Sequence, residues 1–168
     1  MLVLGIDPGT AITGWGLVGK EGNELTLVDY GTVRTSQDSP MPQRLQTIYG
    51  ELGQVISCHH PTAIAVEQLF FSKNVRTAMV VAQARGVALL AVADAGVPLH
   101  EYTPLQVKQS VCGYGKATKE QVQKLVQMLL DLDFVPQPDD AADAIAVAIC
   151  HLHSERLEAI VAEHADSA

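Results

Sequence analysis

LVLGID, residues 2–7, is the stretch that decides the fold. Its apolar run is nearly continuous, which is typical of a central strand covered on both faces, and its last residue, Asp7, stands where that strand leaves the core. TGWGLV and ELTLVDYGTVRT follow, separated by Gly and Asn turn signals. Both runs favour β structure, so this part of the chain predicts three consecutive strands in an antiparallel meander.

Helical and strand patterns alternate after the meander. Apolar residues recur at helical spacing from Leu45 to Ile56, AIAV beginning at Ala63 predicts a buried strand, and Leu99 to Tyr102 predict another. Three more helices are expected, with caps at Thr103, Thr118 and Asp139. The pattern predicts an α/β fold with a mixed five-stranded sheet, in which two parallel strands follow three antiparallel ones and helices cover both faces.

A long helix is expected between the last two strands, from about Asn74 to Ala95, and it is apolar on nearly every side. A sheet covers only one face of such a helix. Something else must therefore cover the rest, and a second subunit is one candidate.

The chain has 168 residues, a mass of 18.0 kDa and 48% hydrophobic residues, which suits one compact domain. We expect that domain to span residues 1–168, with residues 155–168 as a mobile acidic tail. The sequence shows neither a secretory signal nor an uninterrupted apolar run of about 18 residues. Its three cysteines are far apart and form no CxxC pair. These features predict a soluble cytoplasmic protein without membrane contact, disulfide framework or zinc knuckle.

The net charge of -8 hides an uneven distribution along the chain. Residues 72–124 hold seven basic and three acidic side chains, whereas residues 1–71 and 125–168 are acidic. Phosphate binding depends on the local potential, and bound metal would neutralise some of the flanking acids. The overall acidity therefore does not exclude DNA as a partner.

Four carboxylates stand at the ends of apolar segments. Asp7 and Glu67 each close a predicted strand, while Asp140 and Asp143 lie three apart in the first turn of a helix and so share one face. Each has an ordinary explanation alone, as a turn residue, a strand terminus or a partner of the helix dipole. If all four converge, they repel one another unless a cation compensates. Mg²⁺ suits an all-oxygen site, and two such ions would support phosphodiester hydrolysis.

Five stretches of the chain resemble, in order and spacing, the bacterial RuvC family of Holliday junction endonucleases. They are GIDPGTAITGWGLV, AVEQLFFSKN, QARGVALLAVADAGVPLHEYTPLQVKQSV, GYGKATKEQV and DDAADAIAVAICH, and together they cover roughly residues 1–153. The resemblance implies a ribonuclease H-like fold and a homodimer that resolves four-way DNA junctions by paired symmetric nicks. It also implies 5′-phosphate and 3′-hydroxyl ends, a role in recombination and DNA repair, and cooperation with the RuvA–RuvB branch-migration complex.

The family's four metal-binding carboxylates fall on Asp7, Glu67, Asp140 and Asp143, the residues already selected by position. The resemblance implies two Mg²⁺ ions per active site, with Mn²⁺ as a substitute. Asp139 adds a fifth acid, which leaves the choice of ligand between Asp139 and Asp140 slightly open. The spacing between Asp140 and Asp143 fits the family motif, which favours Asp140. Asp139 is better placed as the helix cap.

The same match implies DNA-binding residues. Phe70 falls on an aromatic that inserts among bases, and stacking of this kind contributes about 1–3 kcal/mol per base. Lys108 and Lys119 match lysines that hold the scissile phosphate or offset charge in the transition state. Weaker candidates for phosphate contacts lie in the same basic segment: Lys73, Arg76, Arg85, Lys116 and Lys124.

Three other functions fit parts of the sequence. DPGT before a glycine-rich strand also resembles the phosphate turn of actin and sugar-kinase-type phosphotransferases, but those proteins need two lobes and a longer chain. A related ribonuclease H-like nuclease that processes RNA would use similar acids. A non-catalytic junction-binding module would not need all four carboxylates.

Overall fold

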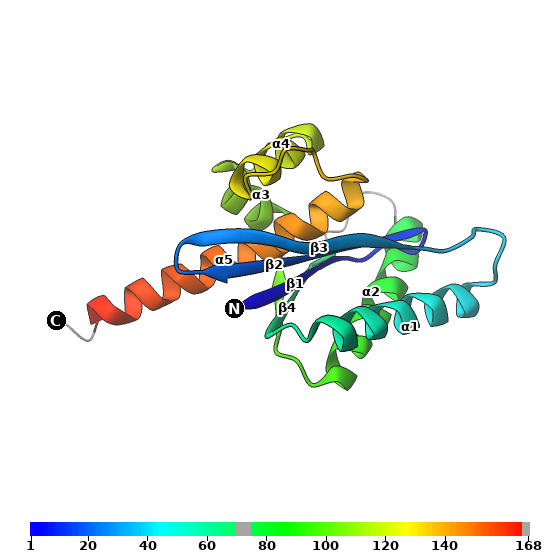
Figure 1. The fold of residues 1–168 in the computed structure, drawn as a ribbon. Helices are drawn as coiled ribbons and strands as arrows, with labels where there is room; N and C mark the ends of the chain where they lie inside the picture. Colours follow the sequence, from blue (N-terminus) through cyan, green and yellow to red (C-terminus); the bar gives the residue numbers. More distant parts are fainter. Residues whose placement is uncertain (70–74, 166–168) are drawn as a thin grey trace.

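Five strands form one mixed sheet with helices on both faces (Figure 1). The computed structural model describes the backbone of residues 1–69 and 75–165 and the side chains of residues 1–69 and 77–156. The elements are β1 (Leu2–Asp7), β2 (Ile12–Glu21), β3 (Glu24–Arg34), α1 (Met41–His59), β4 (Ala63–Glu67), α2 (Val75–Ala95), β5 (Leu99–Tyr102), α3 (Pro104–Cys112), α4 (Lys119–Leu129) and α5 (Asp139–Ala165).

The sheet has the strand order β3-β2-β1-β4-β5, so β1 is central, as its continuous apolar run predicts. β1, β2 and β3 pair antiparallel, and β4 and β5 then add in parallel. The predicted α/β class and sheet are confirmed. The prediction that β5 is a buried strand is wrong: Leu99, His100 and Glu101 are exposed, because β5 stands at the edge of the sheet, beside β4.

Alternation along β1 assigns its side chains to two cores. Leu4 and Ile6 pack with α1 and α2, whereas Val3 packs with α5 on the other face, which also carries α3 and α4 (Figure 1). By the same period of two, Gly5 and Asp7 face α5. In β4, Ala63 and Ala65 share the α5 side, and Ile64 and Val66 share the other. Glu67 therefore also faces α5.

Three glycines let α5 lie directly on the sheet. An ideal Cβ at Gly5 would lie 2.0 Å from the carbonyl oxygen of Ala144, and one at Gly14 would lie 1.9 Å from that of Asp140. At Gly16 it would lie 2.4 Å from the Ile145 side chain. Any other residue at these positions would push the helix away from the strands.

The helix ends confirm two of the three predicted caps. Thr103 and Thr118 each form a capping box with the residue three positions on. The third prediction is wrong, because Asp139 is the first residue of α5 and the Pro138 carbonyl accepts the opening helical hydrogen bonds from Ala141 and Ala142. The Asp139 carboxylate pairs with Lys119 and also accepts from backbone N–H groups of this first turn. α5 continues to Ala165, so the acidic segment from Glu155 to that residue is helical.

Replacing Gly5 by Ala tests how closely α5 must approach. We expect Gly5→Ala to destabilise the protein by about 1–3 kcal/mol, because the methyl group would overlap two backbone atoms of α5. Gly53→Ala in α1 is the matched control: its added Cβ meets nothing within 4 Å, and the change should stabilise by about 0.4–1 kcal/mol. Urea unfolding measures both. Equal stability of the two variants would contradict the close approach.

Candidate active site

The ends of β1 and β4 bring Asp7 and Glu67 together. The two strands are parallel, with Ile6 opposite Val66, so the next residue on each is an acid that faces α5. The two carboxyl groups share a hydrogen bond. The turn after Asp7 is tied down by the buried Thr13, whose hydroxyl donates to the Gly9 carbonyl at 2.7 Å.

The first turn of α5 brings the other two acids to the same place. Gly14 pairs with Asp7 in the β1–β2 ladder, and the backbone of Asp140 lies directly over Gly14. Asp143 follows on the same helix face. Asp7 is an electrostatic neighbour of Glu67, Asp143 and Asp140. The structure therefore brings all four predicted carboxylates together.

Burial and mutual repulsion disturb the acid–base properties of this cluster. Burial, followed by the charges of Glu67, Asp143 and Asp140, raises the pKa of Asp7 well above its ordinary value. Burial and the charge of Asp143 raise the pKa of Glu67 to about 7, although the hydrogen bond from Asp7 opposes this. Burial also raises the pKa of Asp143. A cation placed among these groups would relieve the repulsion.

The donor set fits a hard divalent cation. All the converging groups are carboxylate oxygens, the ligands that Mg²⁺ prefers. Within residues 1–69 and 77–156, no three His, Cys, Asp or Glu side chains are already arranged to hold a metal ion. The four acids are thus electrostatic neighbours rather than a closed ligand shell, and the raised pKa values of Asp7, Glu67 and Asp143 indicate a site that a cation would stabilise.

Two lysines lie beside the carboxylates. Lys119 Nζ is 2.8 Å from Asp139 Oδ2 and 3.5 Å from Asp143 Oδ2. Its hydrogen bond to Asp139 raises the pKa of Lys119 and lowers that of the acid. The half-buried Lys108 also contributes positive potential at Glu67. Asp140, and not Asp139, is among the groups whose charge raises the pKa of Asp7, which favours Asp140 as the fourth carboxylate.

A small cleft of about 210 Å³ opens at these strand ends. Asp7, Glu67, Gln68 and Leu69 line it, and Arg85 of α2 contributes a guanidinium. Sequence reasoning placed Arg85 only among weak phosphate contacts. Its place beside the acids depends on how α2 packs, and no local motif reports that packing.

The other predicted DNA-binding residues are less fully described. Lys116 and Lys124 are exposed and have no described contact with the carboxylates. The predictions for Phe70 and Lys73 lie outside the described residues. Arg76 belongs to α2, but its side chain is likewise outside the described part.

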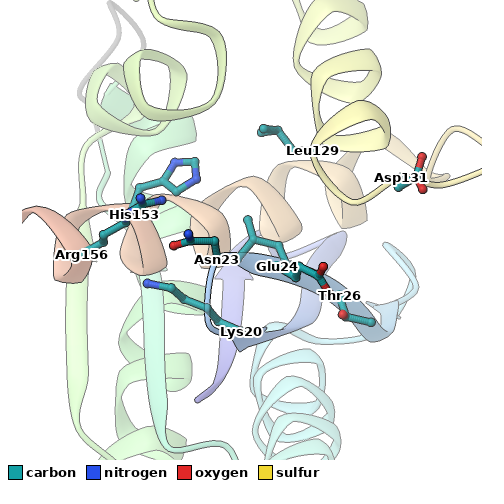
Figure 2. Close-up of a pocket in the computed structure, with 9 residues that line it drawn as sticks. Lys20, Asn23, Glu24, Thr26, Leu129, Asp131, His153 and Arg156 are labelled. Carbon is teal, nitrogen blue, oxygen red and sulfur yellow. The ribbon is translucent and has the colours of Figure 1, made fainter.

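A larger pocket of about 460 Å³ lies toward the other end of α5 (Figure 2). His153 and Arg156 of α5 face Lys20 of the β2–β3 hairpin across it. His153 is thirteen residues beyond Asp140, about 20 Å along the helix. Glu24 and Asp131 line the same pocket and offset its cations, so its charge does not favour an anion.

Comparison with known proteins agrees with this geometry. The family profile described as "Crossover junction endodeoxyribonuclease RuvC" matches residues 3–151. Relatives of that name from Desulfitobacterium hafniense and Pelotomaculum thermopropionicum are each 57% identical, over 94% and 91% of this chain and 95% and 93% of theirs.

Solved structures agree as well. Thermus thermophilus RuvC superposes with a TM-score of 0.86 at 38% identity, covering 94% of this chain and 97% of that one. The same protein in complex with Holliday junction substrate gives 0.85 at 36% identity, covering 94% and 96%. The yeast mitochondrial resolvase Ydc2, at 14% identity and a TM-score of 0.65, shares the fold. This ribonuclease H-like chain, with four acids converging at its strand ends, belongs to the crossover junction endodeoxyribonuclease RuvC family.

Proposed function

We propose that this protein is a divalent-metal-dependent endonuclease that resolves four-way DNA junctions by paired symmetric nicks during recombination and repair. The observation that carries the proposal is the convergence of Asp7, Glu67, Asp140 and Asp143 in a chain that belongs to the RuvC family. The Thermus thermophilus relative has been solved with a Holliday junction substrate, which supports the same substrate here.

The four carboxylates would hold the catalytic cations, proposed as two Mg²⁺ ions with Mn²⁺ as a substitute. Bound there, they would activate a water and stabilise the departing 3′ oxygen. Water attacks phosphorus and the bond to the 3′ oxygen breaks, leaving 5′-phosphate and 3′-hydroxyl ends. Lys108 and Lys119 would hold the scissile phosphate and offset its charge, and their proximity to Glu67 and Asp143 supports this role.

DNA contacts beyond the scissile phosphate are assigned from sequence position. Phe70 follows Leu69, which lines the cleft, and we assign it to stacking on bases near the crossover. Lys73, Arg76 and Lys116 are assigned to backbone phosphates. The RuvA–RuvB branch-migration complex is proposed as partner from the family resemblance, and a cytoplasmic location is proposed from the cysteine pattern of the sequence.

Helix α2 supports a homodimer. Its exposed face carries small and apolar residues three or four apart, and Met79 and Leu90 are 64% and 53% exposed. We call this face the α2 stripe: Met79, Ala82, Gly86, Leu90 and Ala93. A two-fold pair of subunits docked through it would present two active sites for two symmetric nicks.

A membrane is a weaker explanation for the same face. Residues Thr77–Ala95 are long and apolar enough to cross a bilayer by composition, with a mean hydropathy of 1.5 and 28% of the stretch buried. However, Arg85 stands mid-helix in an ion pair with Glu101, and the opposite face packs Ala84 and Ala88 into the core. A charged arginine in the middle of a membrane-spanning helix costs free energy in lipid, which weakens the membrane explanation.

The function is tested with a synthetic four-way junction, a duplex and a structured RNA, each with and without Mg²⁺. We expect paired nicks on the junction only, and Asp7→Asn should lower the rate more than about 100-fold, since even outer-shell partners of metal ligands contribute about 10–100-fold. Asp131→Asn, at an exposed acid with a backbone that Asn tolerates, is the control and should cleave normally. Preferred RNA cleavage, or nicking that survives Asp7→Asn, would contradict the proposal.

The acid cluster also predicts how stability depends on pH. In EDTA, the free energy of unfolding should fall as pH rises from about 4.5 to about 7, because folded Glu67 binds its proton more tightly than the unfolded chain does. The size is at most about 3 kcal/mol. Glu67→Gln should flatten this slope, and Mg²⁺ should restore stability at pH 8. Urea unfolding across pH measures it; a wild-type stability that rises over this range would be inconsistent with the cluster.

Dimer formation is tested by placing a charge in the α2 stripe. Met79→Glu should shift the protein from dimer to monomer in sedimentation velocity and abolish paired nicking, because a buried unpaired carboxylate opposes association. Met128→Glu is the matched control, since Met128 is 73% exposed on α4, outside the stripe. A Met79→Glu protein that remains dimeric would remove the stripe as the interface.

A further inference from the structure

Arg85 joins three elements at the candidate active site. Its guanidinium Nη2 pairs with Oε1 of Glu101 on β5, and its Nε donates to the backbone carbonyl oxygen of Glu67 on β4 at 3.4 Å. The arginine side chain is only 20% exposed. The same residue lines the cleft that contains Asp7 and Glu67. A single side chain of α2 therefore contacts both parallel strands where they end.

Strand register explains how Arg85 reaches these groups. Glu101 lies opposite Val66, a residue on the α1–α2 side of the sheet, so the Glu101 side chain meets α2. The Glu67 carboxylate points to the other face, toward α5. Arg85 thus contacts the Glu67 backbone from the α1–α2 side of the sheet, while the Glu67 carboxylate on the α5 side stays available to a cation.

The β4–β5 ladder reaches this strand end, where Glu67 pairs with Tyr102. The Gln68 N–H donates to the Tyr102 carbonyl at 2.8 Å, which extends the β4–β5 ladder by one residue. Beyond Leu69 the described residues stop. Arg85 therefore adds a side-chain contact to the Glu67 backbone at the last pair of the β4–β5 ladder. A guanidinium suits the task because its donors form a planar fork and it is always charged.

The ion pair also distinguishes Arg85 from the basic residues expected to bind DNA. Glu101 neutralises its charge, and the surrounding elements shield the side chain. Lys116 and Lys124, in contrast, are exposed. A phosphate would have to compete with Glu101 for the guanidinium, so strand positioning is the better role.

We propose that Arg85 is a positioning residue that fixes the end of β4 and thereby sets where the Glu67 carboxylate meets the catalytic cation. The proposal rests on the proposed nuclease function. It predicts that loss of Arg85 impairs metal use and turnover at bound substrate, while the junction still binds.

The test compares Arg85→Gln, Arg85→Lys and Glu101→Gln with the wild type. We expect Arg85→Gln to lower kcat on the junction about 10–100-fold, the range typical of outer-shell partners of metal ligands, and to raise the half-saturating Mg²⁺ concentration several-fold. KM, and junction affinity in EDTA, should stay within about two-fold. Arg85→Lys keeps the charge but loses the fork, so its kcat should be intermediate. Glu101→Gln still accepts from Arg85 and should show the mildest loss.

Arg156→Gln is the matched control, because it removes the same charge from an exposed arginine at the far pocket (Figure 2). It should leave kcat and the Mg²⁺ dependence unchanged. Each rate is expressed per folded protein, with the folded fraction measured by circular dichroism. If Arg85→Gln does not fold, Glu101→Gln is the variant that tests the proposal.

Three outcomes would overturn the proposal. Weaker junction binding with a shallower salt dependence in Arg85→Gln would make Arg85 a phosphate contact. A lower melting temperature with normal kcat and Mg²⁺ dependence would make it merely structural. Unchanged behaviour would remove any role. Failure of the wild type to cleave junctions would instead refute the proposed function, so the two failures are distinguishable.

Discussion

The close approach of α5 to β1 and β2 is the constraint on which the site depends. Asp140 and Asp143 reach Asp7 only because the strands carry Gly5, Gly14 and Gly16 where the helix crosses them. Here the absence of side chains is functional: contact between helix backbone and strand backbone replaces the usual side-chain layer. The same contact lets the buried half of α5 serve as the main packing element of one core.

The site is built at the expense of local stability. Asp7, Glu67 and Asp143 lie half-buried together on one side of the sheet, and each has a raised pKa because partial burial and like charge disfavour ionisation. Lys119 offsets part of this charge through Asp143 and Asp139. Strain of this electrostatic kind is common where a fold is arranged for a ligand rather than for its own stability.

Much of the fold could be predicted from residue patterns, because those patterns report burial. The apolar run before Asp7 identified the central strand, and the acids that end β1 and β4 stood where parallel strands must end side by side. The errors concern properties that a local pattern does not carry. β5 resembles a buried strand, yet its exposure follows from its place at the sheet edge. Asp139 resembles a cap, yet a lysine twenty residues earlier holds it.

The positioning role of Arg85 could not be predicted from the sequence for the same reason. Within a basic segment it looks like one more phosphate contact, and its partners, Glu101 and the Glu67 carbonyl, are set by how a helix packs across two strands. The convergence of the acids was predictable from their positions at element ends. The supports behind them were not, because they depend on tertiary packing.

Helix α2 has one further consequence. One face of this continuous helix contacts Glu67 through Arg85, and another face carries the α2 stripe, to which a second copy of the chain would bind. In a dimer formed through that stripe, no flexible hinge would separate the two catalytic centres. The span between the two cuts would then be a fixed dimension of the enzyme, and the branched substrate, rather than the protein, would have to adapt its arms to it.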